Sequence, residues 1–470
     1  MPLGDLSPEL VLLGGAVLIL LHALVAPRRY QAWAAGLAVL TLLVAAAAAV
    51  ILLSGAGQLT FHGTYAVDGA ALWGKLLVLG VTAGVIALSV EWFIDDPRHG
   101  EYYTLLLLAA LGAVAMAGAA DLMQLVLAVL LSSAPAAVLI AYHRRSRRAG
   151  EAALKFYLLG ALANGAMVFG VALLFGLAGT TTYAGLLATL PASDPLTLVV
   201  AVGLVVVGLA FKLGAVPVHS WLPDAADGAP APVAAFVAAV PKIGALIALA
   251  RFMAVVPEHL AGWRVLIAVL AAATMTLGNV AALWQDDVRR LLGWSAVSQA
   301  GYGMMAVVAL GRSSLAIPAL LYFLVAYALA TVVAFGVVVA LKGEADRTRY
   351  AGLARAHPWL AFALLVSFLS FIGIPPLVGF GAKLTLFTAA LDAGYGWLAV
   401  VAIVNTALSV AYYIRVLVPV YVEPAADATT CTSSALPLTA IAVGVAGIIV
   451  LGIFGETALA AFRGARLLPG

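Results

Sequence analysis

The chain has 470 residues, of which 65% are hydrophobic and only 10% are charged, and its formal net charge is +3. Because soluble domains carry about 25% charged residues, this composition excludes a soluble enzyme and a disordered chain. The small net charge, without a long basic tract, excludes a nucleic-acid binder. The sequence therefore predicts an all-α protein that crosses the membrane many times.

Fourteen apolar stretches are long enough to cross a bilayer, which takes about 20 helical residues. In chain order the expected spans are 8–26, 32–53, 71–91, 103–119, 122–142, 152–178, 196–218, 231–255, 264–284, 291–311, 315–341, 358–389, 395–422 and 436–460. The stretch 358–389 is long enough to contain a break. The first stretch lacks an A-x-A-like processing site and is followed by further spans, so we expect a membrane helix and not a removed signal peptide.

Common cofactor and metal motifs are missing from the sequence. The single cysteine, Cys431, excludes a disulfide framework, an iron–sulfur cluster and a thiolate zinc site. The seven histidines form no HExxH pattern, and there is no GxGxxG or Walker-type phosphate loop. We therefore expect this chain to bind no metal and no redox cofactor itself.

Basic residues in the expected loops predict the orientation of the chain. Alternate loops place 14 basic residues on one side of the membrane and five on the other. The richer side holds Arg28, Arg29, Arg98, Arg144, Arg145, Arg147, Arg148, Arg289, Arg290, Lys342, Arg347, Arg349, Arg355 and Arg415. The poorer side holds Arg251, Arg264, Arg312, Arg463 and Arg466. By the positive-inside rule the richer side is cytoplasmic, and an even number of spans then places both termini outside.

Lysine and arginine are sorted between the spans and the loops. All 18 arginines lie in loops or towards span ends, whereas five of the six lysines lie inside spans: Lys75, Lys155, Lys212, Lys242 and Lys383. A lysine at the centre of a membrane helix costs about 2.5–3.5 kcal/mol. A buried lysine can release its proton, whereas arginine stays charged. The sorting therefore predicts a path for protons.

Some of these positions have simpler structural interpretations. Lys75 lies a few residues inside its span, so we expect its amine to extend to the membrane surface. Lys155 is four residues after Glu151 on the same helical face, where an anchoring ion pair explains it as well as a proton relay does. His219 either caps the cytoplasmic end of its helix or exchanges protons. For the three deeper lysines we favour a functional role.

Two spans carry proline breaks close to a lysine. Pro217 follows Lys212 by five residues, and the pair Pro375 and Pro376 precedes Lys383. Proline removes a backbone donor and frees a carbonyl oxygen one turn earlier. Within a membrane, such a backbone is stable only where protein or a water-filled cavity satisfies it. Broken helices of this kind are typical of ion transporters.

The spacing of the breaks predicts an internal repeat. Pro217 and Pro375 are 158 residues apart, and two groups of five spans surround them. Because five is an odd number, the second group is expected to be inverted relative to the first. The expected parts are three N-terminal helices in 1–102, a five-helix repeat in 103–260, an inverted five-helix repeat in 261–422 and a C-terminal helix in 423–470.

Three long motifs resemble the antiporter-like membrane subunits of respiratory complex I. They are, in order, GLAFKLGAVPVHSWLPDAADGAPAPVAAFVAAVPK, QDDVRRLLGWSAVSQAGYGMM and GIPPLVGFGAKLTLF. The later segment VNTALSVAYYIRV points, within that family, to the subunit N branch, called subunit 2 in mitochondria. The resemblance covers at least residues 103–422.

The resemblance implies a function, partners and site residues. Members of the family move protons through half-channels joined by a row of lysines, which match Lys155, Lys212, Lys242 and Lys383 here. The chain would be a non-redox subunit of a proton-translocating NADH:quinone oxidoreductase in the bacterial cell membrane. It would assemble with other membrane-arm subunits, while quinone, FMN and iron–sulfur clusters would be bound by partner subunits.

The sequence departs from the family pattern at two positions. Relatives place a glutamate in the fifth helix, whereas the matching stretch DLMQLVLAVLLSS has Leu130 there. In VSQAG, Gln299 stands where relatives often have histidine. Either Glu151 or a carboxylate of a neighbouring subunit replaces the missing charge beside Lys212, or this copy is weakly coupled and serves partly as a scaffold.

Two other functions compete with this interpretation. One is a subunit of a multi-subunit cation/proton antiporter of the Mrp type, which shares the fold and several motifs. The other is a non-conducting structural subunit, which Leu130 suggests. The segment VNTALSVAYYIRV and Lys383 favour the complex I assignment.

Overall fold

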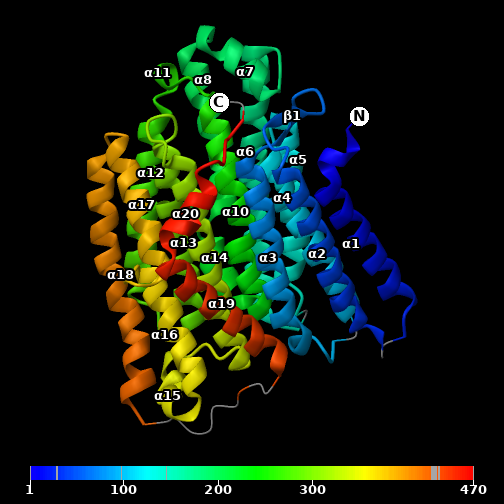
Figure 1. The fold of residues 1–470 in the computed structure, drawn as a ribbon, viewed down its shortest axis with the longest axis vertical. Coiled ribbons are helices and arrows are strands. Elements are labelled where there is room, and N and C mark those ends of the chain that lie inside the picture. The colour runs from blue at the N-terminus through cyan, green and yellow to red at the C-terminus, as the bar shows by residue number, and fades with distance from the viewer. Residues whose placement is uncertain are drawn as a thin grey trace.

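Long helices that run along one axis make up nearly all of the described chain (Figure 1). The computed structural model describes residues 2–27, 30–96, 98–143, 145–424, 431 and 434–468. Three residues of the charge argument, Arg28, Arg29 and Arg144, lie outside these ranges. The only strands in the described ranges are the short antiparallel pair β1 (Gln58–Thr60) and β2 (Tyr65–Val67).

The long helices follow the expected spans closely. They are α1 (Ser7–Val25), α2 (Trp33–Leu53), α3 (Gly69–Trp92), α4 (His99–Gly118), α5 (Leu122–Ile140), α6 (Arg147–Ala178), α8 (Pro195–Leu213), α10 (Ala231–Val255), α12 (Trp263–Ala282), α13 (Val288–Val308), α14 (Ala316–Ala340), α16 (Pro358–Ile372), α17 (Val378–Asp392), α18 (Gly396–Val422) and α19 (Ala435–Ile453). Short helices between and beside them are η1 (Leu3–Leu6), α7 (Tyr183–Thr189), η3 (Leu190–Ala192), α9 (Trp221–Gly228), α11 (Glu258–Ala261), η4 (Arg347–Tyr350), α15 (Leu353–Ala356) and α20 (Gly455–Phe462).

Twelve helices in the described ranges are long and apolar enough to cross a membrane by themselves. Two further expected spans differ from this simple form. The helix α13 has the length, but polar and small residues along it, such as Gln299 and Gly301, lower its hydropathy. The stretch 358–389 consists of two helices of 15 residues each, α16 and α17, so each alone is shorter than a span.

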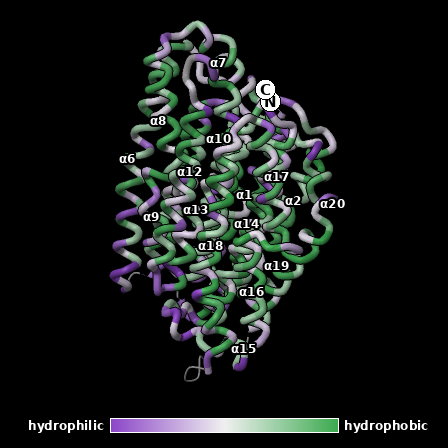
Figure 2. Tube along the Cα trace, turned by 90° about the vertical axis from the view of Figure 1, so that its left-hand side faces the viewer, coloured by the Kyte–Doolittle hydropathy of each residue, from purple (hydrophilic) through white to green (hydrophobic). Residues whose placement is uncertain are grey.

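Hydrophobic residues fill the middle of the bundle, and hydrophilic residues gather at its ends (Figure 2). The outer helices expose large aliphatic side chains, as Leu43 on α2 and Leu162 on α6 show. A surface of this kind suits contact with lipid or with another apolar protein surface. At the centre of the bundle, α10 is enclosed by its neighbours over its whole apolar length.

Two helices break where glycine ends the first half. Gly214 follows α8 with a φ of +65°, and Gly373 follows α16 with a φ of +91°. Glycine reaches this left-handed conformation without the steric cost that a Cβ adds, so it ends helices. The segments that follow contain the cis peptide bonds Val216–Pro217 and Pro375–Pro376. The helices α9 and α17 then form the second halves of the two broken helices.

Candidate functional site

Lys212 lies in the last turn of α8, directly before the first break. Its side chain is buried, and its Nζ atom lies 6.0 Å from the centre of the Phe156 ring on α6. Its Nζ has no hydrogen-bond partner, and no carboxylate of the described residues lies within ion-pair distance of it. The first break therefore holds an amine without an internal counter-charge.

Lys242 lies near the middle of the central helix α10 and is buried. Its Nζ donates to the carbonyl oxygen of Ala296 on α13 and lies 3.2 Å from the hydroxyl oxygen of Tyr327 on α14. The Tyr327 hydroxyl in turn donates to the carbonyl oxygen of Ala238 at 2.8 Å. Lys242 thus joins three helices by polar contacts in the centre of the bundle.

Lys383 lies on α17, directly after the second break. Its Nζ donates to the carbonyl oxygen of Ile372 at 3.2 Å and lies 4.1 Å from the centre of the Tyr302 ring. A cavity of about 10 Å³ is lined by Lys383, Tyr327 and Gln299, among others. That volume is about what a single water molecule needs. Tyr327 therefore contacts Lys242 and also faces the small cavity beside Lys383.

The two breaks share one feature of hydrogen bonding. At the first break, the indole Nε1 of Trp221 on α9 donates to the carbonyl oxygen of Phe211 at 3.0 Å. At the second, Lys383 donates to the carbonyl oxygen of Ile372. Phe211 and Ile372 are 161 residues apart in the sequence. In both cases, a side chain from the second half-helix donates to a carbonyl oxygen in the last turn of the first half; the Phe211 oxygen also accepts from the Gly214 amide at 3.0 Å.

Lys155 lies apart from the buried lysines, near the start of α6. Its side chain is 49% exposed and forms ion pairs with Glu151 at 2.6 Å and with Asp224 of α9 at 2.9 Å. Asp224 also pairs with Arg290 of α13 at 2.6 Å. The ion pair with Glu151 that the sequence suggested is present, and the carboxylate of α9 extends it into a small network.

His219 and the prolines of the two breaks lie near the surface of the chain. The His219 ring is half-buried, and its centre lies 5.6 Å from that of the Trp294 ring. Pro217, Pro375 and Pro376 are exposed. At the first break, the hydroxyl of Thr274 on α12 accepts a hydrogen bond from the Val216 amide at 3.2 Å, which satisfies one backbone donor.

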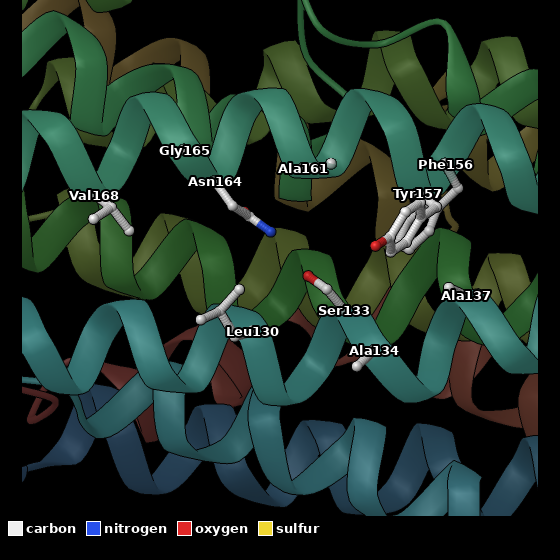
Figure 3. A pocket seen from close by; sticks show the side chains of 11 residues that line it. Leu130, Ser133, Ala134, Ala137, Phe156, Tyr157, Ala161, Asn164, Gly165 and Val168 are labelled. Carbon is white, nitrogen blue, oxygen red and sulfur yellow. The ribbon is translucent and has the colours of Figure 1, made fainter.

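Leu130, the position of the missing glutamate, lines a cavity of about 400 Å³ between α5 and α6. Figure 3 shows the polar groups of Ser133, Tyr157 and Asn164 pointing into this cavity. Leu130 is 42% exposed, so the cavity lies at the outer surface of the chain. Phe156 also lines it, and the Lys212 Nζ atom lies 6.0 Å from the centre of the same ring.

The structure contradicts one explanation for the missing glutamate. Glu151 is 66% exposed and pairs with Lys155, so it does not replace the carboxylate beside Lys212. It lies one turn before Lys155, in the part of α6 next to the arginine-rich loop, where its side chain faces outward. A neighbouring subunit is the remaining source of such a charge.

The expectation for Lys75 is also wrong. Its side chain is fully buried and forms an ion pair with Glu9 of α1 at 2.8 Å. The Tyr65 hydroxyl donates to the same Glu9 carboxylate. Sequence reasoning missed Glu9 because an acid in the first turn of a membrane helix is usually a surface group. It also missed the buried ion pair of Asp68 and Arg251.

The long helices, the two breaks and the buried lysines define a multi-pass membrane protein of the antiporter-like class. The family model described as NADH:quinone oxidoreductase/Mrp antiporter, TM, matches residues 119–409. NADH-quinone oxidoreductase subunit N of Mycobacterium sp. (strain JLS) is 42% identical and aligns over 89% of each chain. Subunit N 1 of Streptomyces griseus is 44% identical over 90% of this chain and 89% of its own. The chain therefore belongs to the subunit N family of NADH-quinone oxidoreductases.

Solved structures agree with this assignment and confirm the predicted fold class. A chain of respiratory complex I from Thermus thermophilus with bound aureothin has a TM-score of 0.84 and 31% identity, covering 97% of this chain and 100% of its own. A chain of the Mrp complex from Dietzia sp. has the same TM-score at 22% identity, covering 100% and 98%. At that identity the likeness shows the fold alone, so the complex I branch is the better match.

Proposed function

We propose that this chain carries protons across the bacterial membrane within a respiratory complex I, using Lys212, Lys242 and Lys383. The observation that carries this proposal is the contact between Lys242 and Tyr327, whose ring also lines the small cavity beside Lys383. A hydroxyl and one water molecule would then connect two buried amines across the bundle. Lys155, which forms ion pairs with Glu151 and Asp224, would stand at the entrance of the first repeat, 103–260.

The redox reaction takes place in other subunits. Quinone, FMN and iron–sulfur clusters are expected there, and this chain supplies only groups that bind protons. Energy from quinone reduction would reach the lysines through changes in charge or packing at the subunit boundary. Such a change alters how strongly each amine holds its proton, and a series of these changes moves protons in one direction.

The orientation and the repeats belong to the same proposal. The end of the bundle with α15 and the start of α6 would face the cytoplasm, and both termini would lie outside. The units 103–260 and 261–422 would be inverted repeats with one broken helix each. The matching carbonyl bonds at Phe211 and Ile372 support this relation. Inverted repeats with broken helices near the membrane midplane are a common transporter architecture.

In the first repeat, the buried amine of Lys212 lacks a carboxylate partner from this chain. The Leu130 side chain leaves Lys212 without a counter-charge from this chain, so a protonated Lys212 is stabilised poorly. A carboxylate of a neighbouring subunit could approach through the cavity between α5 and α6, where hydroxyl and amide groups can bind it. Without that carboxylate, the first unit would contribute less to proton transport than the second.

Replacing Lys242 by methionine tests the proposed path. Methionine has a similar length and flexibility but no titratable group. In the assembled complex we expect Lys242→Met to move several-fold fewer protons for each electron passed to quinone. The matched control is Lys342→Met, which removes an exposed lysine outside the spans and should leave this ratio unchanged. Normal assembly with an unchanged ratio in Lys242→Met would remove this residue from the mechanism.

A further inference from the structure

The three N-terminal helices contain an acid–base pair that the lysine row does not use. Glu9 of α1 and Lys75 of α3 form an ion pair at 2.8 Å, and the Tyr65 hydroxyl of β2 donates to the same carboxylate. Lys75 also lies 4.8 Å from the centre of the Tyr65 ring. Lys75 and Tyr65 are almost fully buried, and Glu9 is 8% exposed. The three groups come from separate elements of the chain.

A second ion pair borders this cluster. Arg251 of α10 donates to Asp68 at 2.5 and 3.0 Å and to the carbonyl oxygen of Ala117 at 3.1 Å. It also donates to the carbonyl oxygen of Leu468, whose amide donates to Asp68 at 2.8 Å. Asp68 and Arg251 are the charged groups that face Tyr65 from the start of α3 and from α10.

The two pairs differ in the number of hydrogen bonds that hold the carboxylate. Asp68 accepts hydrogen bonds from Arg251, Leu468 and the Ala71 amide, and arginine does not release its proton in proteins. These donors therefore hold the Asp68 carboxylate in place. In the other pair, the Glu9 Oε2 and Lys75 Nζ atoms are buried without a hydrogen-bond partner, although Lys75 Nζ lies at ion-pair distance from Glu9 Oε1; Arg251 Nε is likewise buried without a partner. Lysine and glutamate can both exchange protons, and the free oxygen is a position where a proton can bind.

We propose that Glu9 and Lys75 form a proton-exchange site at the end of the molecule where both termini lie. This proposal rests on the proton transport proposed above and adds a site outside the lysine row. The proton passes from the Lys75 ammonium to the Glu9 carboxylate, which leaves a neutral amine and a carboxylic acid. Glu9 then releases the proton to water, and Lys75 binds the next one, so the starting charges are restored.

Burial and geometry explain why this pair can change its protonation state. In a medium of low polarity, an ion pair and its neutral form differ little in free energy, because separated charges lose their hydration. Burial raises the pKa of the Tyr65 hydroxyl, so it remains a donor that holds one oxygen of Glu9. Of the two residues, Glu9 lies nearer to the surface, two residues after the start of α1.

The position of the pair links it to the central helix. Tyr65 and Asp68 belong to one short segment, and Asp68 binds Arg251 on α10. Lys242 lies on the same helix, nine residues earlier, which corresponds to about 13 Å along the helix axis. A change of charge at Glu9 therefore acts on a segment that is attached to the helix carrying the central lysine.

The test uses Glu9→Gln and Lys75→Met in the assembled complex. Glutamine keeps the size of the side chain and can still accept from Tyr65, but it cannot bind and release a proton. We expect each variant to assemble, to reduce quinone, and to move fewer protons per electron. The double variant should lose no more than either single variant, because the two residues act as one unit. The matched control is Glu101→Gln, an exposed first-turn acid on α4, which should change nothing.

A second measurement covers the case in which a variant fails to assemble. Infrared difference spectra of the complex during turnover should contain a carboxylic acid band, and Tyr65→Phe, which keeps both charges, should shift that band. An unshifted band in Tyr65→Phe, or an unchanged proton ratio in Glu9→Gln, overturns the proposal. If Lys242→Met loses pumping and Glu9→Gln pumps normally, the Glu9–Lys75 site is overturned and the lysine row stands. If Glu9→Gln loses pumping and Lys242→Met pumps normally, the lysine row is overturned and the Glu9–Lys75 site stands.

Discussion

At the scale of single residues, the two members of a buried ion pair can come from positions that are far apart in the sequence. The burial of Lys212, Lys242 and Lys383 could be predicted, because each lies deep in an apolar stretch. The partner of Lys75 could not be predicted in this way. Glu9 is 66 residues earlier, and the two meet only because the fold brings the start of α1 within reach of α3. Local sequence therefore reveals a buried charge more readily than its partner.

Leu130 shows how one uncharged residue can change the behaviour of a charged one. Lys212 is buried next to Phe156, and the acids on the neighbouring helices are used elsewhere. Asp224 binds Lys155 and Arg290. An isolated buried amine favours its neutral form because burial disfavours the charged one. The first break then holds a proton less well than a break with an internal carboxylate.

Restoring the carboxylate should change proton transport. We expect Leu130→Glu to raise the number of protons moved per electron, because the new negative charge stabilises the protonated form of Lys212. Leu130→Gln, which is polar but uncharged, is the matched control and should have the ratio of the natural protein. Both are measured in the assembled complex at equal quinone reduction. If Leu130→Glu leaves the ratio unchanged, Lys212 takes no part in transport or already has a carboxylate from a partner subunit.

At the scale of elements, glycine and proline locate the breaks more reliably than hydropathy does. The apolar stretch 358–389 is continuous, yet its helix ends at Ile372 because Gly373 adopts a left-handed conformation. Hydropathy also gives no sign that Lys383 closes the end of α16 through the Ile372 carbonyl. Such a bond depends on the path of the chain between the two halves. Helix existence could thus be predicted from composition, but the bonds across a break could not.

The short helix α11 connects the two proposed repeats and is held by ion pairs. The Glu258 carboxylate lies 2.9 Å from Arg264 of α12 and 2.7 Å from Arg312 after α13. The hydrogen bond from Arg264, more than any other contact, holds the pKa of Glu258 below its ordinary value of 4.5. A carboxyl group with a lowered pKa stabilises the folded state above its ordinary pKa. That stabilisation is lost as the pH falls through the folded pKa.

The direction of this pKa shift leads to a prediction for the connection between α10 and α12. After correction for intrinsic rates, hydrogen exchange of amides in 257–264 should increase as the pH falls below about 4.5. Glu258→Gln should already exchange faster at neutral pH and should lose this step with pH. Glu456→Gln, which removes an exposed acid paired with Arg463, serves as the control and should keep the step. Mass spectrometry of the complex in detergent measures both effects. Equal profiles in all three proteins would show that the ion pairs do not hold α11.

At the scale of the whole molecule, the described ends of the chain lie at the same end of the bundle (Figure 1). This arrangement requires an even number of crossings, which fits fourteen spans when each broken helix is counted as one. The arginines of the opposite end lie near α15, the start of α6 and the start of α13. The ionic network of Asp224, Lys155 and Arg290 joins the two proposed repeats at that end. The distribution of arginine therefore predicted the relative placement of the loops.

The absolute orientation can be measured with single cysteines, because the chain has one cysteine, Cys431. In a Cys431→Ser background, Ala56→Cys lies between α2 and β1, at the end with both termini, and Ala356→Cys lies at the end of α15. Both positions are exposed. Because positive loops stay on the cytoplasmic side, a membrane-impermeant maleimide added to intact spheroplasts should label Ala56→Cys and not Ala356→Cys. Permeabilised cells should show labelling of both, which is the control for accessibility. Labelling of Ala356→Cys alone in intact spheroplasts would reverse the orientation, and Glu9 and Lys75 would then exchange protons with the cytoplasm.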